Sequence, residues 1–505
     1  MDIGQGILLG MQNALTPGNL LVCFLGVLWG TLIGVLPGIG PVGGMTILMP
    51  LTFGMDVTSG LIMMAGIYYG SMYGGSTTSI LAAIPGEVAS AVTVLDGHQM
   101  ALKGRAGLAL SLSAIGSFVA GTVGVIALSF VAPALVSVAL DFGPPEYFAL
   151  AALGLSMAAY LGSGSLVKGI SMGLIGLTLS TVGMHITSGE TRFTFNRLEL
   201  LGGIEVVAVL MGIFGVAEVL VNIEKHFSVD LLHVSLFDFR KLLPSRQEWR
   251  VTAGPMVRGS LLGFVVGILP GSGATVSSFL SYAIEKRISK HPERFGTGIP
   301  EGVAGPEAAN NAAAAGAMIP LLSLGVPYNV VTAIMLSAMI VHGVFPSPLL
   351  MEREPLFFWT VICSMYIGNV MLLVLNLPLI GFWASLLRLP YRWLYPMILL
   401  FSITGVYSIN FRMADLWVMM LFGLFGYFMK KLDFPAAPLA LAIVLGPLME
   451  NALTQSMILS DGNPIILLNR PVSGALIALT MLVFVSPLIT KLLGRGDRLV
   501  PVGEE

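Results

Sequence analysis

Charged residues are scarce in this chain, and their scarcity indicates its class. Only 10% of its 505 residues are Asp, Glu, Lys or Arg, while 55% are hydrophobic. A typical soluble domain carries about 25% charged residues. No charged residue occurs from Ile3 to Met55. We therefore expect a polytopic protein in a lipid bilayer. The net charge of −2 excludes a nucleic-acid partner, because phosphate binding depends on a basic surface.

Cysteine and the patterns of several enzyme classes are also lacking. Cys23 and Cys363 lie in apolar runs and are interpreted as packed thiols, not as a disulfide. The six histidines form no HExxH arrangement, so no metal site is predicted. No GxxxxGKS or GxxxxGKT loop is present for ATP hydrolysis. We therefore expect neither an enzyme nor a catalytic residue, and no cofactor.

Long apolar runs fill most of the chain. Runs without any charged residue are 57–86, 106–140, 308–351, 355–387 and 471–490. A membrane-spanning helix needs about 20 residues, so the chain predicts about ten to twelve transmembrane helices. The fold class that we expect is an all-α polytopic membrane protein.

One motif occurs twice within such apolar sequence. Leu36-Pro-Gly-Ile-Gly-Pro41 recurs as Leu269-Pro-Gly-Ser-Gly-Ala274, and Pro37 and Pro270 are 233 positions apart. Pro removes a backbone donor and Gly frees the dihedral angles, so the motif breaks a helix. At membrane depth, the freed backbone groups must face protein or a watery cavity. Paired breaks in two halves of a chain are typical of a transporter's binding site.

A second pair of breaks follows at Pro85 and Pro327, which are 242 positions apart. The difference of nine positions matches the charged insertion Lys286–Arg294. We interpret residues 1–222 as an N-terminal repeat, 223–252 as a polar connector, 253–430 as a second repeat, and 431–505 as C-terminal helices and tail. Each repeat is expected to hold broken or re-entrant helices. Whether the two repeats are inverted or parallel stays open.

Small polar residues near the breaks are candidates for substrate binding. A carboxylate could be held by backbone N–H groups, hydroxyls and amides, because no Lys or Arg lies at the breaks. The alternative is close helix packing by small residues. The candidates are Gly38, Ile39, Gly40, Pro41, Ser76, Thr77, Thr78, Ser79, Ser272, Gly273, Asn310, Asn311, Tyr328 and Asn329.

Four acids closely follow a proline: Glu87, Glu146, Glu301 and Glu307. An acid in the first turn of a helix favours the helix dipole, so capping is one interpretation of each. Glu87 and Glu307 lie nearest the breaks and are kept as candidates for ion coupling. The residues Pro85 and Pro327 join them, because unwound carbonyls at a break can coordinate a cation.

These residues together resemble a known family, the TctA family, which is the large membrane subunit of tripartite tricarboxylate transporters. The resemblance lies in Gly34–Gly40, Tyr69–Leu81 with Pro85-Gly86-Glu87, Asp96-Gly97, Gly267–Gly273 and Glu301–Pro320. It runs from about Gly18 to Gly446.

The resemblance implies a multi-pass permease in the bacterial inner (cytoplasmic) membrane that imports tri- or dicarboxylates. It implies a coupling cation, Na+ or H+, and two partners: a small four-helix membrane subunit and a periplasmic substrate-binding protein. Tyr328 and Asn329 stand where the family often has a small pair, which leaves carboxylates other than citrate open. Ala82–Ile84 also depart from the family, which often has an Asn before this Pro-Gly-Glu.

Other functions stay open at this point. A stand-alone ion-coupled carrier or channel would carry the same motifs. Glu307-Ala308-Ala309 resembles the coupling motif of ABC permeases, but Ala313 stands where that motif has Gly, so this reading is less favoured.

Overall fold

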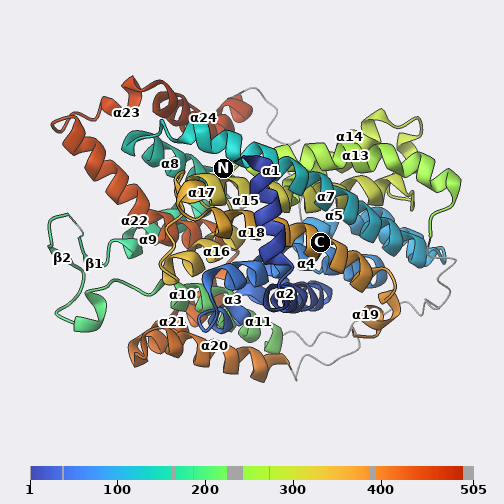
Figure 1. The fold of residues 1–505 in the computed structure, drawn as a ribbon, viewed down its shortest axis with the longest axis horizontal. Coiled ribbons are helices and arrows are strands. Elements are labelled where there is room, and N and C mark those ends of the chain that lie inside the picture. Colours follow the sequence, from blue (N-terminus) through green and yellow to red (C-terminus); the bar gives the residue numbers. More distant parts are fainter. Residues whose placement is uncertain are drawn as a thin grey trace.

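The computed structural model is built almost entirely from helices, which cross one another in several directions (Figure 1). It describes residues 2–36, 39–161, 165–185, 187–224, 243–271, 273–386 and 394–492. Within these residues, seven helices are long and apolar enough to cross a membrane, and shorter apolar helices accompany them. The chain is an all-α, multi-pass membrane protein, as predicted.

The N-terminal part holds a helical hairpin, then two long helices joined by short turns, and later a small β-hairpin. In chain order its first elements are α1 (Ile3–Ala14), α2 (Pro17–Val35), α3 (Gly40–Thr52), α4 (Val57–Ala82), η1 (Val88–Ser90), α5 (Ala91–Thr93), η2 (Val94–His98), α6 (Gln99–Leu102) and α7 (Ala106–Ala139). They are followed by α8 (Pro144–Leu161), α9 (Leu166–Ser180), β1 (Gly183–Met184), β2 (Thr191–Arg192), η3 (Leu198–Leu200), α10 (Val206–Leu210), η4 (Met211–Val216) and α11 (Ala217–Glu224). The antiparallel strands pair Gly183 with Arg192 and project from the helices (Figure 1).

The second part begins with another hairpin and a long buried helix. Its elements are α13 (Arg246–Ile268), α14 (Gly273–Ile288), η5 (Pro292–Arg294), α15 (Glu301–Leu324), α16 (Val330–Val341), α17 (Leu350–Arg353) and α18 (Pro355–Asn376). The C-terminal elements are α19 (Ile380–Leu386), α20 (Leu394–Asn410), α21 (Met413–Lys431), α22 (Ala436–Leu459), α23 (Ile466–Asn469) and α24 (Pro471–Leu492). The division at 223–252 stays a prediction, because 225–242 lie outside the described residues.

Glycines let α2 pack directly on the backbone of α4. A Cβ atom at Gly26 would lie 2.5 Å from the Met63 carbonyl oxygen, and one at Gly30 would lie 2.6 Å from that of Ile67. The residue number of the contact on α4 increases with the residue number on α2, so α2 and α4 run parallel. The intervening helix α3 therefore returns in the opposite direction. Small residues at such an interface allow the closest approach of helix backbones in a membrane.

The second part has the same arrangement. Gly259, Gly263 and Gly267 of α13 face the backbone of α15. They meet the carbonyls of Gly305, Ala309 and Ala313 respectively, so α13 and α15 also run parallel and α14 returns between them. The three glycines lie 233 positions after Gly26, Gly30 and Gly34, and the three carbonyls lie 242 positions after those of Met63, Ile67 and Ser71. Both offsets are the ones that separate the sequence motifs.

We call α2 to α4 the first unit and α13 to α15 the second unit. The two units cross in opposite directions. Ser76 of α4 donates a hydrogen bond to Glu307 near the start of α15. The Tyr68 hydroxyl, earlier in α4, accepts one from Asn329, which follows the end of α15. The helices α4 and α15 are therefore antiparallel. Helix α7 packs against both and runs parallel to α15, because Gly116 lies beside Ala304 and Gly124 beside Ala312.

A buried aspartate ties the units together at one end. The Asp96 side chain is fully buried and accepts hydrogen bonds from Gly296, Gly298 and Ile299 backbone N–H groups at 2.6 to 3.1 Å. The Tyr282 hydroxyl donates a further bond at 2.9 Å. Unlike hydroxyls, the three backbone N–H groups lie just before the start of α15, where the helix dipole favours a negative charge. Asp96 therefore anchors the turn that leads into α15.

Replacing Gly30 by Ala should disturb the α2–α4 contact. The new methyl group would press on the Ile67 carbonyl, and overpacking of this kind costs roughly 1–3 kcal/mol. Gly18→Ala on the same helix is the matched control, because its Cβ would have no neighbour within 4 Å. Thermal unfolding of the purified variants in detergent should give a lower midpoint for Gly30→Ala only. Equal midpoints in both variants would contradict the close packing.

Candidate functional site

The first helix break is held by the helix that packs on it. The Thr78 hydroxyl of α4 donates a 2.6 Å hydrogen bond to the Val35 carbonyl at the end of α2. Beyond α4, Gly86 donates its N–H to the Gly75 carbonyl at 3.3 Å. Pro37 and Gly38 themselves lie outside the described residues. Thr78 thus satisfies a carbonyl that the break leaves without a partner in its own helix.

The predicted residues on the far side of this break begin helix α3. Ile39 is buried, whereas Gly40 and Pro41 are half-buried. Gly40 has φ +61°, a left-handed conformation that favours glycine, and its position is open. The first N–H groups of α3 therefore start beside the break.

The second break has an equivalent support. Gly271 has φ +117° and donates its N–H to the Tyr328 carbonyl at 2.9 Å. Ser272 lies outside the described residues, and Gly273, the first residue of α14, packs against Gly267. Each hairpin tip is thus bonded to its own unit.

A polar cluster surrounds Glu307, which lies near the end of the second turn of α15 and is fully buried. Ser76 donates to its Oε2 at 2.5 Å and Ser113 of α7 donates to the same atom at 3.1 Å. Thr93 of α5 donates to Oε1. The Asn310 Nδ2 atom on the same helix is buried and has no hydrogen-bond partner among the described residues. Side chains from α4, α5 and α7 therefore converge on one carboxyl group of α15.

The two adjacent asparagines have different surroundings. The Asn311 Nδ2 atom donates to the Ser117 hydroxyl of α7 at 2.7 Å, to the Glu307 carbonyl at 3.1 Å and to the Asn310 Oδ1 atom at 2.5 Å. The Asn310 Oδ1 atom is thus engaged by Asn311, while its Nδ2 atom has no hydrogen-bond partner among the described residues. The sequence-based expectation that adjacent helix positions point in different directions agrees with these contacts.

Glu87 caps a short helix. Its side chain accepts the Ser90 backbone N–H at the start of η1, and Ser90 returns a hydroxyl contact to Glu87. Ser79 of α4 donates to the same Ser90 hydroxyl at 2.9 Å. The capping interpretation therefore describes Glu87, while its buried Oε1 atom has no hydrogen-bond partner among the described residues. Glu307 is different, because α15 starts six residues before it.

The remaining candidates lie apart from the Glu307 cluster. Tyr328 packs in an apolar cluster with Leu150 of α8 and Leu445 of α22. Asn329 caps α16 through Thr332. Thr77 and Pro327 are buried, and Pro85 is half-buried. A role for these residues in substrate or ion binding stays a prediction.

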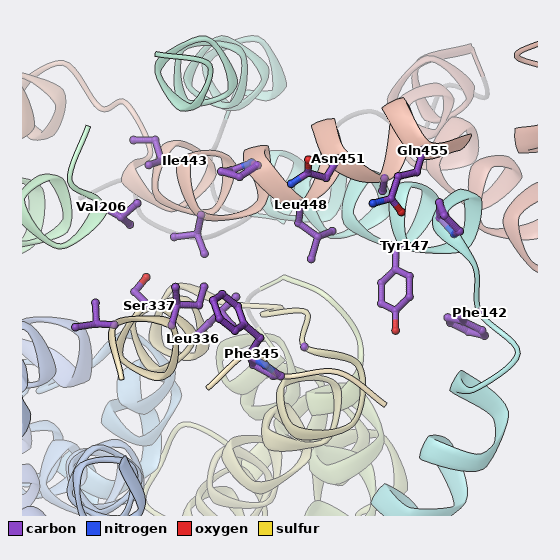
Figure 2. A pocket seen from close by; sticks show the side chains of 18 of the residues that line it. Phe142, Tyr147, Val206, Leu336, Ser337, Phe345, Ile443, Leu448, Asn451 and Gln455 are labelled. Atoms are coloured by element: carbon purple, nitrogen blue, oxygen red, sulfur yellow. The ribbon is translucent and has the colours of Figure 1, made fainter. Parts of the chain in front are cut away.

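A separate cavity of about 640 Å³ lies between α8 and α22 on one side and α16 with its following loop on the other (Figure 2). Its walls are mainly apolar, as Leu336, Phe345 and Leu448 show. Glu205 is its sole charged lining residue among those described, and no Lys, Arg or His lines it. Apolar walls with one acid do not suit a carboxylate, so this cavity does not fit the predicted substrate.

Sequence reasoning missed Thr93, Ser113 and Ser117 as partners of the central cluster. A signal existed for the two serines. They lie four positions apart in the uncharged run 106–140, so a helix places them on one face. Thr93 gives no comparable signal, because its place depends on the short turns η1 and α5, which bring it back against α15.

The buried carboxylate and the paired helix breaks define a polytopic α-helical membrane protein of the transporter class. Comparison with known proteins gives the family. A family model described as "Tripartite tricarboxylate transporter TctA family" matches residues 20–441. The chain therefore belongs to the TctA family.

Two relatives come from Agrobacterium vitis. One, described as an uncharacterised 52.8 kDa protein in the TAR-I ttuC′ 3′ region, is 46% identical over 498 residues, which cover 99% of each chain. The other, an uncharacterised protein in the TAR-II ttuC′ 3′ region, is 42% identical over 236 residues, 47% of this chain and 98% of the relative. No solved structure gives a significant match.

Asn311→Ala should lower stability, because it removes a bond between α15 and α7. Interhelical bonds in membranes contribute about 0.6 kcal/mol on average. Ser117→Ala should cost a similar amount, and the double variant should cost little more than either single one. Asn310→Ala, which has no such bond to α7, should instead alter transport affinity. Thermal unfolding in detergent and uptake assays measure the two effects, and additive losses from the two α7–α15 variants would contradict the assigned bond.

Proposed function

We propose that this chain is the permease subunit of a binding-protein-dependent secondary transporter in a bacterial inner membrane. It imports tri- or dicarboxylates, driven by a Na+ or proton gradient. The structural observation that carries the proposal is the antiparallel crossing of two helix–break–helix units around Glu307. Antiparallel units with discontinuous helices are a recurrent architecture of secondary transporters. The family match supports carboxylate as the substrate class.

The substrate would be held by dipoles. Helices α3 and α14 each begin at a break, at Gly40 and Gly273, and their first N–H groups carry partial positive charge. Carboxylates suit such donors. Arg258, which could otherwise serve as a counter-ion, is engaged by Glu285 through two hydrogen bonds of 2.7 and 2.8 Å. Tyr328 and Asn329 follow the break at Pro327 and are proposed to tune the choice of carboxylate.

The partners follow from the tripartite family. A periplasmic substrate-binding protein would deliver the carboxylate, and a small four-helix membrane subunit would complete the permease. The principal rival is a carrier or channel that works alone. The two differ in whether this chain needs its partners for uptake.

Reconstitution tests the proposal. Liposomes holding this chain with the small membrane subunit, and with the binding protein added outside, should accumulate radiolabelled carboxylate when an inward Na+ or proton gradient is imposed without ATP. Liposomes without the binding protein are the control and should take up little. Uptake that strictly needs ATP would refute a secondary transporter, and full uptake by this chain alone would favour the rival.

A further inference from the structure

The Glu307 carboxyl group is buried without a basic partner among the residues that the structure describes. Its side chain is 0% exposed, and no described Lys, Arg or His forms an ion pair with it. The groups that donate hydrogen bonds to it are three hydroxyls, which bring no positive charge. A buried charge is normally paired, bound to a metal ion, or removed by protonation. Glu307 therefore needs a cation from outside the chain.

Two other acidic residues lie on elements that pack near α15, and each has partners of its own. Glu285 of α14 is bound by Arg258 of α13. Asp96 of η2 is held by the turn before α15 and by Tyr282. None of these groups supplies the missing positive charge.

Three further titratable groups lie near the same end of α15. His98 of η2 contacts the Ile80 carbonyl through Nδ1. Glu301 is half-buried in the first turn of α15. Glu87 is buried at the start of η1, and its Oε1 atom has no hydrogen-bond partner among the described residues.

The atoms around Glu307 suit a small hard cation. Such cations take oxygen ligands from carboxylates, hydroxyls and carbonyl groups. The Ser76, Thr93 and Ser113 hydroxyls can rotate, so each can either donate to the carboxylate or turn a lone pair to a bound ion. The Asn310 Oδ1 atom accepts a hydrogen bond from Asn311 and is therefore left out of the proposed ligand set.

We propose that the coupling cation, Na+ or a proton, binds at Glu307, with Ser76, Thr93 and Ser113 completing the site. The proposal rests on the proposed function, because it names the coupling group of that transporter. The ligands come from α4, from α5 and α7, which follow it in the N-terminal part, and from α15 of the second unit. Neutralising Glu307 therefore stabilises the contact between the two units, and its charge weakens that contact when the cation leaves.

The test is cation-dependent thermal stability of the purified chain in detergent, without substrate, binding protein or gradient. Choline is exchanged for Na+ at fixed pH, and separately the pH is lowered from about 8 to about 5 without Na+. Wild type should gain stability in a saturable way, since a ligand of the folded state stabilises it. A response to Na+ at fixed pH identifies Na+ as the cation, and a response to pH alone identifies the proton.

Glu307→Gln should abolish that response, because the amide is neutral and keeps nearly the same shape. Glu301→Gln is the matched control on the same helix and should respond as wild type does. Ser113→Ala and Thr93→Val should raise the half-saturating concentration of the cation roughly three- to tenfold, as expected for one lost polar ligand. These two variants test the site even where Glu307→Gln does not fold.

Three outcomes would overturn the proposal: no response of wild type to either cation, an undiminished response in Glu307→Gln, or unchanged half-saturation in both hydroxyl variants. The transport proposal stands or falls separately. Cation-driven uptake with a cation response that does not depend on Glu307 would refute this site alone. A response that does depend on Glu307, without uptake in liposomes, would refute the transport proposal alone.

Discussion

Backbone groups at a helix break cannot be left unpaired inside a membrane, and the architecture of this protein follows from that constraint. The Val35 carbonyl is bonded by Thr78, and the Gly271 N–H is bonded to the Tyr328 carbonyl. Thr78 lies in α4, which packs beside the first hairpin. Tyr328 follows α15, which packs beside the second hairpin. Each hairpin therefore needs a parallel helix at very short distance. The glycine faces of α2 and α13 permit that distance.

The same close packing explains where the polar cluster lies. Helices α4 and α15 each support a hairpin and cross in opposite directions, with α7 packed against both. Small side chains on α4 and α15 leave room for Glu307 and its hydroxyl partners at this crossing. A buried carboxylate there costs stability unless it is neutralised. That cost is the physical basis for a link between cation binding and the contact of the two units.

The sequence was sufficient to predict the fold class, because scarce charge and long apolar runs leave few alternatives. The breaks between α2 and α3 and between α13 and α14 were also predictable, since Pro-Gly pairs stand out in apolar sequence, and Glu307 became a candidate because lone acids do the same. The relative direction of the two units was not predictable. It depends on which faces of α4 and α15 meet, and no local pattern encodes that. Thr93 was missed for the same reason, as its contact with Glu307 spans 214 positions.

The central claim is that α4 and α15 cross in opposite directions, and cysteine cross-linking tests it most directly. In a background with Cys23 and Cys363 replaced by Ser, cysteine pairs are placed at Tyr68 with Asn329 and at Ser76 with Glu307. A short bifunctional thiol reagent should join both pairs, because their side chains are in hydrogen-bond contact. The exchanged pairs, Tyr68 with Glu307 and Ser76 with Asn329, should stay unlinked. Cross-linking of the exchanged pairs instead would show parallel helices and contradict the account.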